Sequence, residues 1–422
     1  MNPVQPKRWI RRAWFCLLCA AITATSSFGA EQLQGSDATR NTDSALIKRL
    51  LARVDELEAE VRQIKGAGSV KAVEPEAAAP SKQAQPAELA VAHSESHGLV
   101  APGLQIRGFA DVGFGASNEK GTTNSFGLGQ IDLFMTSRLS ENISALGELV
   151  FESGDDNKIG ADFERMLIQY APSDYFRLGV GRYHTSIGYY NTAYHHGTWF
   201  QTAIGRPFLF RFEDEGGVLP IHNVGLTATG RVPSGRLGLS YVVELGNGRA
   251  YSKDAEAVQN VHDENNGKAL NVGMKVRPDR IPGFQAGFSW YRDRLTPSES
   301  SPVNEGIAAA HVVYDVSSWN LLVEGVLLRH SPINSRRTFN TPAFYSQVSR
   351  HFGKQEPYFR YEYMNALRSD PILAGVGLRH WASAGIKHAV GEFSAIKFEY
   401  QRQLRSGQKD IHSLQTQLAF TF

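Results

Sequence analysis

From residue 104 to the end of the chain, apolar and polar residues alternate in segments of about ten, and this period of two restricts the fold more than any other feature. The pattern is clearest at the end, where Leu414, Leu418, Phe420 and Phe422 share one face and smaller or polar residues separate them. Alternate residues of a strand point to opposite faces, so each segment predicts a strand with one apolar face. An ordinary half-buried strand has the same pattern, so the connections have to decide the fold.

The connections between these segments fall into two groups. Short links are predicted near residues 140–142, 172–174, 233–235, 278–283, 317–318, 353–355 and 391, and longer polar links near 116–125, 153–160, 183–217, 248–266, 295–305, 330–340, 366–375 and 404–411. Seven short turns that alternate with eight long loops imply sixteen strands, with both chain ends on the short-turn side. Membrane barrels separate short turns from long external loops in this way. We therefore predict an all-β fold, a transmembrane antiparallel β-barrel of about 16 strands over residues 104–422.

In such a barrel the apolar faces of the strands contact lipid and the charged faces line the lumen. The residues predicted to face the lumen are Arg107, Asp111, Arg165, Arg177, Lys275, Arg360, Glu362, Arg379, Lys397 and Glu399. A wider count adds the bases Arg277 and Lys387 and the acids Asp132, Glu148, Glu244 and Glu324. Bases and acids then nearly balance, which predicts a weak anion preference at most.

The first thirty residues have the pattern of an export signal. A basic start is followed by an apolar stretch and then by small residues, which predicts a signal peptide over residues 1–30. The apolar stretch is too short to span a bilayer, and it contains both cysteines of the chain. The mature protein is therefore predicted to form no disulfide. Removing the four basic residues takes the formal net charge from +2 to about −2. The mature chain therefore has no overall positive charge that would favour binding to nucleic acid.

Residues 45–65 follow a polar, flexible segment at 31–44 and have an apolar residue at every third or fourth position. These predicted coiled-coil core residues are Ile47, Leu50, Val54, Leu57, Val61 and Ile64. About three heptads form a short coiled coil but not a stable lone helix, so the segment has to associate. A β-branched residue at a with Leu at d favours a dimer, whereas the run RVDELE at residues 53–58 resembles the Arg-apolar-x-x-apolar-Glu pattern of short trimeric coiled coils. We favour the trimer over the dimer, and over an amphipathic helix that lies on another surface.

Residues 66–103 are rich in Ala, Pro, Ser and Gln without periodicity, and they predict a flexible linker between the coiled coil and the barrel. Because the linker has no apolar pattern of its own, the coiled coil is predicted to be a separate periplasmic module.

The longest predicted loop, residues 183–217, contains the run H-T-x-x-G-Y-x-N-T-A-x-H-H-G at residues 184–197. This run resembles a Gram-negative outer-membrane porin family related to the phosphate-selective (O/P-type) porins. The resemblance covers essentially the whole mature chain, and it implies a homotrimeric channel whose third external loop folds inward and narrows the lumen. The terminal Phe422 also resembles the signal that the barrel-assembly machinery of the outer membrane recognises.

The charges at the narrowest point of a porin determine its selectivity. The candidate constriction residues of the loop are His184, His195, His196, Arg206, Arg211, Glu213, Asp214 and Glu215. Basic groups opposite the acids would produce a transverse field that orders polar solutes. Alternatively, the acids at 213–215 and the following glycines anchor the loop to the wall. The loop contains no lysine, and a phosphate channel needs a lysine cluster and an arginine ladder, so phosphate specificity is not expected.

A metal site, an enzyme and a structural tether are the other functions that the sequence could indicate. We predict no metal site and no cofactor, because adjacent His195 and His196 diverge in an extended chain, although Asp214 or Glu215 could help to complete a site with them. We predict no enzyme, because the G-x-S-x-G pattern is absent. The prediction is therefore a porin for passive diffusion of small polar or anionic solutes. The alternative is a structural barrel that is tethered to peptidoglycan or a periplasmic partner through its coiled coil.

Overall fold

The computed structural model describes residues 103–154, 157–194, 197–251, 260–297 and 301–422. The predicted signal peptide and coiled coil lie outside these residues, as do His195 and His196 and all of the predicted linker except residue 103.

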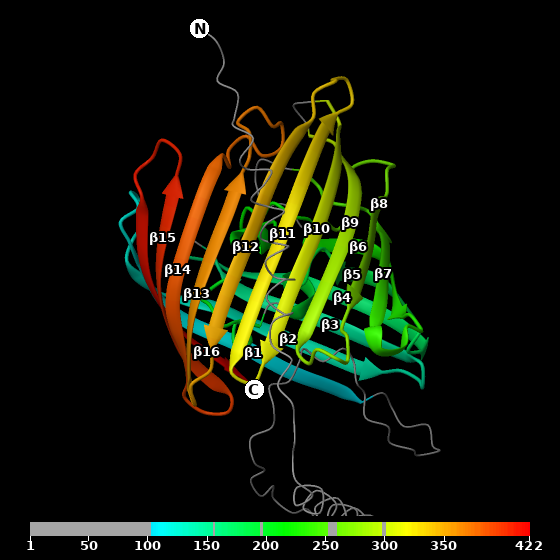
Figure 1. The fold of residues 1–422 in the computed structure, drawn as a ribbon, viewed down its shortest axis with the longest axis horizontal. Helices are drawn as coiled ribbons and strands as arrows, with labels where there is room; N and C mark the ends of the chain where they lie inside the picture. The colour runs from blue at the N-terminus through cyan, green and yellow to red at the C-terminus, as the bar shows by residue number, and fades with distance from the viewer. Residues whose placement is uncertain (1–102, 155–156, 195–196, 252–259, 298–300) are drawn as a thin grey trace, which may run out of the picture. The chain divides into compact units, whose positions relative to one another are not determined.

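The described residues form sixteen strands and three short helical segments (Figure 1). The strands are β1 (Leu104–Ser117), β2 (Ser125–Arg138), β3 (Ile143–Ser153), β4 (Ile159–Ser173), β5 (Phe176–His184), β6 (His222–Arg231), β7 (Leu239–Gly246), β8 (Ala269–Val276), β9 (Phe284–Leu295), β10 (Val303–Val316), β11 (Trp319–Pro332), β12 (Phe339–Arg350), β13 (Gln355–Asn365), β14 (Leu378–Ala389), β15 (Ser394–Arg405) and β16 (Ile411–Thr421). The helical segments are α3 (Tyr190–Ala193), η1 (Phe208–Phe210) and η2 (Gly235–Leu237).

Each strand pairs with its neighbours in sequence, and β1 pairs with β16, so the sheet closes into an antiparallel barrel. The closing ladder sets Phe109 opposite Thr421. It extends through the last residue, because the Phe422 amide donates to the Gly108 carbonyl at 3.0 Å and the Gly108 amide donates back at 2.8 Å. Closure leaves no strand edge unpaired. The prediction of a sixteen-stranded antiparallel barrel is confirmed.

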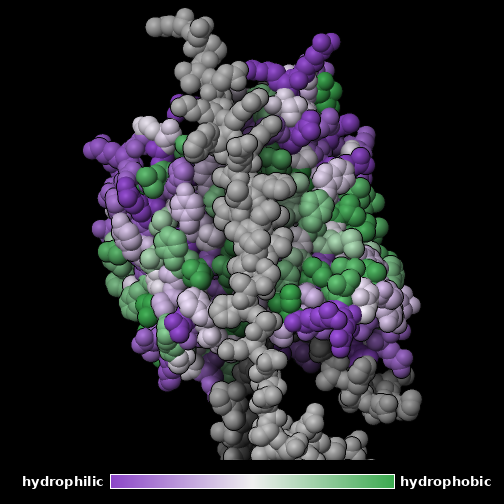
Figure 2. Space-filling model, viewed as in Figure 1, coloured by the Kyte–Doolittle hydropathy of each residue, from purple (hydrophilic) through white to green (hydrophobic). Residues whose placement is uncertain are grey.

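The two faces of the wall differ as the alternation requires. Val323, Phe359 and Phe398 are 37 %, 46 % and 51 % exposed, whereas Glu324 and Arg360, next to them in sequence, are each 1 % exposed. The exposed face is therefore the apolar one, and the buried face carries the charges. Figure 2 shows hydrophobic residues gathered across the middle of the visible wall and hydrophilic residues towards both ends. An apolar outer band of this kind is typical of membrane-spanning barrels.

The connections alternate in length less sharply than predicted. Residues 317–318 form one of the short turns and residues 185–221 the longest loop, but the link at 406–410 on the long side is shorter than the turn at 232–238 on the short side. Among the described residues, no helix is long and apolar enough to cross a membrane.

The predicted bounds of the long loop, 183–217, were wrong. The β5–β6 ladder continues through the pair His184 and His222, and the Thr185 amide then donates to the Ile221 carbonyl at 2.8 Å. The loop therefore spans residues 185–221, and His184 belongs to the wall.

Candidate functional site

The loop at 185–221 lies inside the barrel. Its backbone bonds to side chains of Glu244 on β7, Glu324 on β11 and Lys397 on β15. These three residues are 2 %, 1 % and 0 % exposed, and they belong to the buried, charged face of the wall. A loop that reaches the inner faces of strands so far apart has to cross the lumen.

The carboxylate of Glu324 holds the first part of the loop. It accepts hydrogen bonds from the amides of Tyr189 and Tyr190 at 2.5 and 2.9 Å, and from the Tyr345 hydroxyl on β12 at 2.5 Å. Gly188 allows this approach, because its φ is +73° and a Cβ there would lie 2.3 Å from a Glu324 oxygen. Three donors on one buried carboxylate fix the position at which α3 begins.

Bases of the inner wall hold the middle of the loop. Lys397 on β15 donates to the Thr198 carbonyl at 2.6 Å, and Lys387 on β14 donates to the Trp199 carbonyl at 2.9 Å. Arg360 on β13 donates to the carbonyl of residue 205 at 3.0 Å. These cations bond to carbonyl groups of an irregular backbone that has no strand partner.

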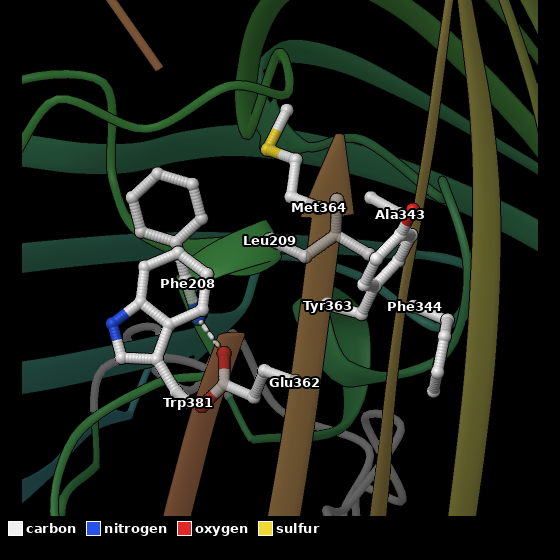
Figure 3. A pocket seen from close by; sticks show the side chains of 8 residues that line it. All are labelled: Phe208, Leu209, Ala343, Phe344, Glu362, Tyr363, Met364 and Trp381. Atoms are coloured by element: carbon white, nitrogen blue, oxygen red, sulfur yellow. Dashed lines mark hydrogen bonds between the residues drawn. The ribbon is translucent and has the colours of Figure 1, made fainter. Parts of the chain in front are cut away.

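The segment η1 and the wall together line a pocket (Figure 3). The Phe208 amide donates to Glu362 on β13 at 2.5 Å. The Phe208 ring stacks on Trp381 of β14, with the two ring centroids 4.5 Å apart. Leu209, also in η1, lines the same pocket as Met364 of the wall and is 3 % exposed. Hydrophobic burial and one charge-assisted hydrogen bond therefore act together at this point.

Arg206 organises the interior of the loop itself. Its guanidinium lies 4.1 Å from the centroid of the Phe212 ring and donates to Asn191 Oδ1 at 2.9 Å. Burial lowers the pKa of Arg206. Asn191 in turn donates to the Thr185 carbonyl at 2.9 Å and to the Ile221 carbonyl at 3.0 Å, which ties the two ends of the loop together.

Glu213 closes the last part of the loop. Its carboxylate accepts hydrogen bonds from the amides of Ile221 and His222 at 2.7 and 2.9 Å and from Asn260 Nδ2 at 2.8 Å. His222 Nδ1 lies 3.0 Å from the other oxygen. Burial alone would raise the pKa of Glu213, but the charge and hydrogen bonds of His222 outweigh it, and the pKa is below its usual range. Glu213 is thus an anchor of the loop.

A second acidic group lies beside this anchor. Glu152 on β3, Asp162 on β4 and Asp214 each place an oxygen within 4.8 Å of the others, and all three are half-buried. Burial and the neighbouring carboxylates of Glu164 and Glu215 raise the pKa of Asp214 to about 6. Negative charge is therefore concentrated on this side of the loop.

The predicted constriction residues divide by exposure. Three are buried, namely His184, Arg206 and Glu213, and Asp214 is half-buried. Arg211 is half-buried with its guanidinium 5.5 Å from the centroid of the Phe208 ring, and Glu215 is exposed. His195 and His196 lie outside the described residues.

The predicted lumen-facing residues also have different surroundings. Five of them bond to the loop, namely Asp111, Arg360, Glu362, Lys397 and Glu399. Arg165 pairs with Glu148, Arg177 lies 3.5 Å from Asp174, and Arg379 donates to the Val376 carbonyl at 2.8 Å. Lys275 is half-buried on β8, and Arg107 is exposed on β1. Half of this set therefore holds the loop.

Sequence reasoning missed a network that holds two further loops. Arg249, in the loop 247–268, donates to Glu305 on β10 at 3.2 Å through its Nε. His330 on β11 lies 3.0 Å from Glu305 and 2.8 Å from Asp370, in the loop 366–377. Glu305 and His330 face each other across the ladder. Alternation places both on one face, but it carries no signal for which loop residues reach them.

The closed sixteen-stranded barrel, with an apolar outer face, a charged inner face and a loop inside, has the architecture of outer-membrane β-barrels. Comparisons with protein-family models and with curated proteins found no match.

Solved structures share the fold. The outer membrane channel DcaP of Acinetobacter baumannii matches with a TM-score of 0.56 and 9 % identity, over 79 % of this chain and 100 % of that chain. OmpF of Salmonella typhi, in complex with daunomycin, matches with a TM-score of 0.53 and 13 % identity, over 76 % and 97 %. The trimer form of OmpT, an outer membrane protein of Vibrio cholerae, matches with a TM-score of 0.51 and 10 % identity, over 76 % and 100 %. At these identities the likeness establishes the barrel fold.

Proposed function

We propose that this chain is a porin of the bacterial outer membrane, a water-filled channel through which small polar or anionic solutes diffuse passively. The observation that carries the proposal is a long loop folded into a closed sixteen-stranded barrel and bonded to charged residues of its inner wall. A loop in this position narrows a lumen without filling the barrel with a separate domain. The fold shared with the outer membrane channel DcaP and with OmpF supports it. We propose no catalytic role.

The proposed selectivity is weak. Lys387, Lys397 and Arg360 donate to loop carbonyls, so these bases contribute less to an arginine or lysine path for anions. The acidic group around Asp214 opposes anion passage further. On the resemblance of residues 184–197, we propose that the chain belongs to the broad class related to the phosphate-selective (O/P-type) porins, without their phosphate specificity.

The proposal includes a homotrimer in the outer-membrane lipid, with the coiled coil of residues 45–65 in the periplasm. The heptad pattern and the OmpT structure described as a trimer form support this assembly. Insertion by the barrel-assembly machinery through Phe422, and contact of the coiled coil with peptidoglycan, belong to the same proposal.

Single-channel current of the refolded protein in a planar bilayer tests the function. Discrete current steps in groups of three support a trimeric pore, and a salt gradient reads ion preference from the sign of the reversal potential. A correctly folded barrel without conductance would refute the porin function. It would favour the alternative, a structural barrel tethered to the cell wall or a periplasmic partner through its coiled coil.

A further inference from the structure

Two histidines and a glutamate meet in the wall where the loop begins and ends. His184 is the last residue of β5 and His222 the first of β6, and the two are paired across the ladder. The β4–β5 ladder pairs Met166 with Arg182, and Glu164 and His184 each lie two residues beyond this pair on their own strands. Three adjacent strands therefore carry this row of residues, Glu164, His184 and His222.

The side chains of this row converge. One ligand atom from each of the three residues lies within 4.8 Å of the other two, and the residues are 6 %, 6 % and 4 % exposed. The histidine rings lie edge to face with centroids 4.8 Å apart, and His222 Nε2 is 2.7 Å from Glu164 Oε2.

An ion at the centre of such a triangle is about 2.8 Å from each corner at most. Zinc bonds to nitrogen and oxygen at about 2.0–2.2 Å, so adjustments of under about 1 Å complete the geometry.

The surroundings also fit a metal ligand set. The other ring nitrogen of His222, Nδ1, lies 3.0 Å from Glu213 Oε2. A carboxylate on the far nitrogen of a ligating imidazole fixes the ring orientation and increases its basicity. Glu213 is itself fixed by the Ile221 amide and by Asn260. The two carboxylates next to the rings, Glu164 and Glu213, offset the charge of a divalent ion, whereas the Arg182 guanidinium, 3.9 Å from Glu164 Oε2, is an opposing charge.

From this geometry we propose that Glu164, His184 and His222 bind one divalent transition-metal ion of the zinc class, with Glu213 as the positioning residue of His222. The ion takes the place of the proton between His222 Nε2 and Glu164. Because His184 ends β5 and His222 begins β6, the metal ties together the two strands between which the loop 185–221 is inserted. The inference does not rest on pore function, since binding is measured without transport.

Cobalt(II) is the probe, because it replaces zinc and absorbs visible light when imidazole and carboxylate ligands bind it. Refolded protein without a polyhistidine tag should take up one equivalent per chain, with a saturating visible band that zinc abolishes. His184→Asn and Glu164→Gln should each reduce the cobalt affinity at least tenfold. His311→Asn, which removes a different buried wall histidine, should leave the affinity unchanged.

The histidines at 195 and 196 provide a second control. The double variant H195Q/H196Q should bind cobalt like the wild type, and loss of the band in that variant would overturn the assignment. A folded wild-type barrel without saturable cobalt uptake also overturns it, even where the substituted variants do not refold. Wild-type affinity in both His184→Asn and Glu164→Gln has the same consequence.

Discussion

Glu324→Gln should release the first part of the lumen loop. The carboxylate accepts the amides of Tyr189 and Tyr190 and the Tyr345 hydroxyl, and it is 1 % exposed. A glutamine keeps one accepting oxygen and presents an NH₂ group, which is itself a donor, where the second oxygen stood. At least one of the three buried donors therefore loses its acceptor.

The magnitude follows from that single lost bond. A hydrogen bond to a charged group contributes about 1.5 to 3 kcal/mol, and the smaller value already changes an equilibrium about tenfold. The loop keeps its bonds to Glu244, Glu362 and Lys397, so the barrel should stay folded while the segment at 189–194 detaches. We expect the fraction of time spent in a state of larger conductance to rise about tenfold or more.

Single-channel recording measures these dwell times, and heat-modifiable migration on a denaturing gel checks that the barrel is folded. Glu392→Gln is the matched control, because it removes the same charge from an exposed turn between β14 and β15. A folded Glu324→Gln channel with wild-type dwell times would refute the reasoning, since the loop would then not depend on this carboxylate.

Three further predictions test other parts of the molecule. Deleting about ten residues around 189–197 should raise single-channel conductance, because a shorter loop obstructs the lumen less; unchanged conductance would place the loop outside the conducting path. Leu57→Pro should weaken the trimer in cross-linking but leave a folded barrel, because proline breaks a helix; loss of the barrel would show that the coiled coil is not a separate module. Acidification from about pH 7.5 to about pH 5 should shift the reversal potential towards anions, because Asp214, with a pKa raised to about 6, is ionised above that pH and neutral below it. Asp214→Asn should reduce this shift, and an equal shift in that variant would assign it to another group.

Alternation and the lengths of the connections together predicted the barrel well, because a strand in a membrane wall has to present apolar residues to lipid at every second position. Phe359 and Phe398 are exposed and Arg360 is buried, as that argument requires. The turns were found for the same reason, since polar breaks interrupt the pattern. The loop bounds failed because His184 and His222 continue the ladder with polar side chains, and no apolar alternation marks them as strand.

Alternation could not predict what the inward charges contact. It assigns a residue to a face, whereas the partner depends on how a long loop folds back across the lumen. Lys397 and Glu399 on β15 were predicted from their register, and both bond to the loop backbone instead of only to water. The pairing of Glu213 with Asn260 joins two different loops, and neither sequence segment carries a pattern that indicates the other.

The charges of the inner wall follow from the backbone of the loop. An irregular segment inside a barrel has amide and carbonyl groups without strand partners, and each of them is costly to bury unpaired. The wall supplies carboxylates where the loop presents amides, as at Glu324 and Glu362, and lysines where it presents carbonyls, as at Lys387 and Lys397. Near balance between inward acids and bases is then what the loop requires, because its backbone carries donors and acceptors in nearly equal numbers. Ion preference has to come from the charges outside this arrangement, and for that reason the exposed Arg107 and the acidic group at Asp214 are better candidates for selectivity than the buried residues.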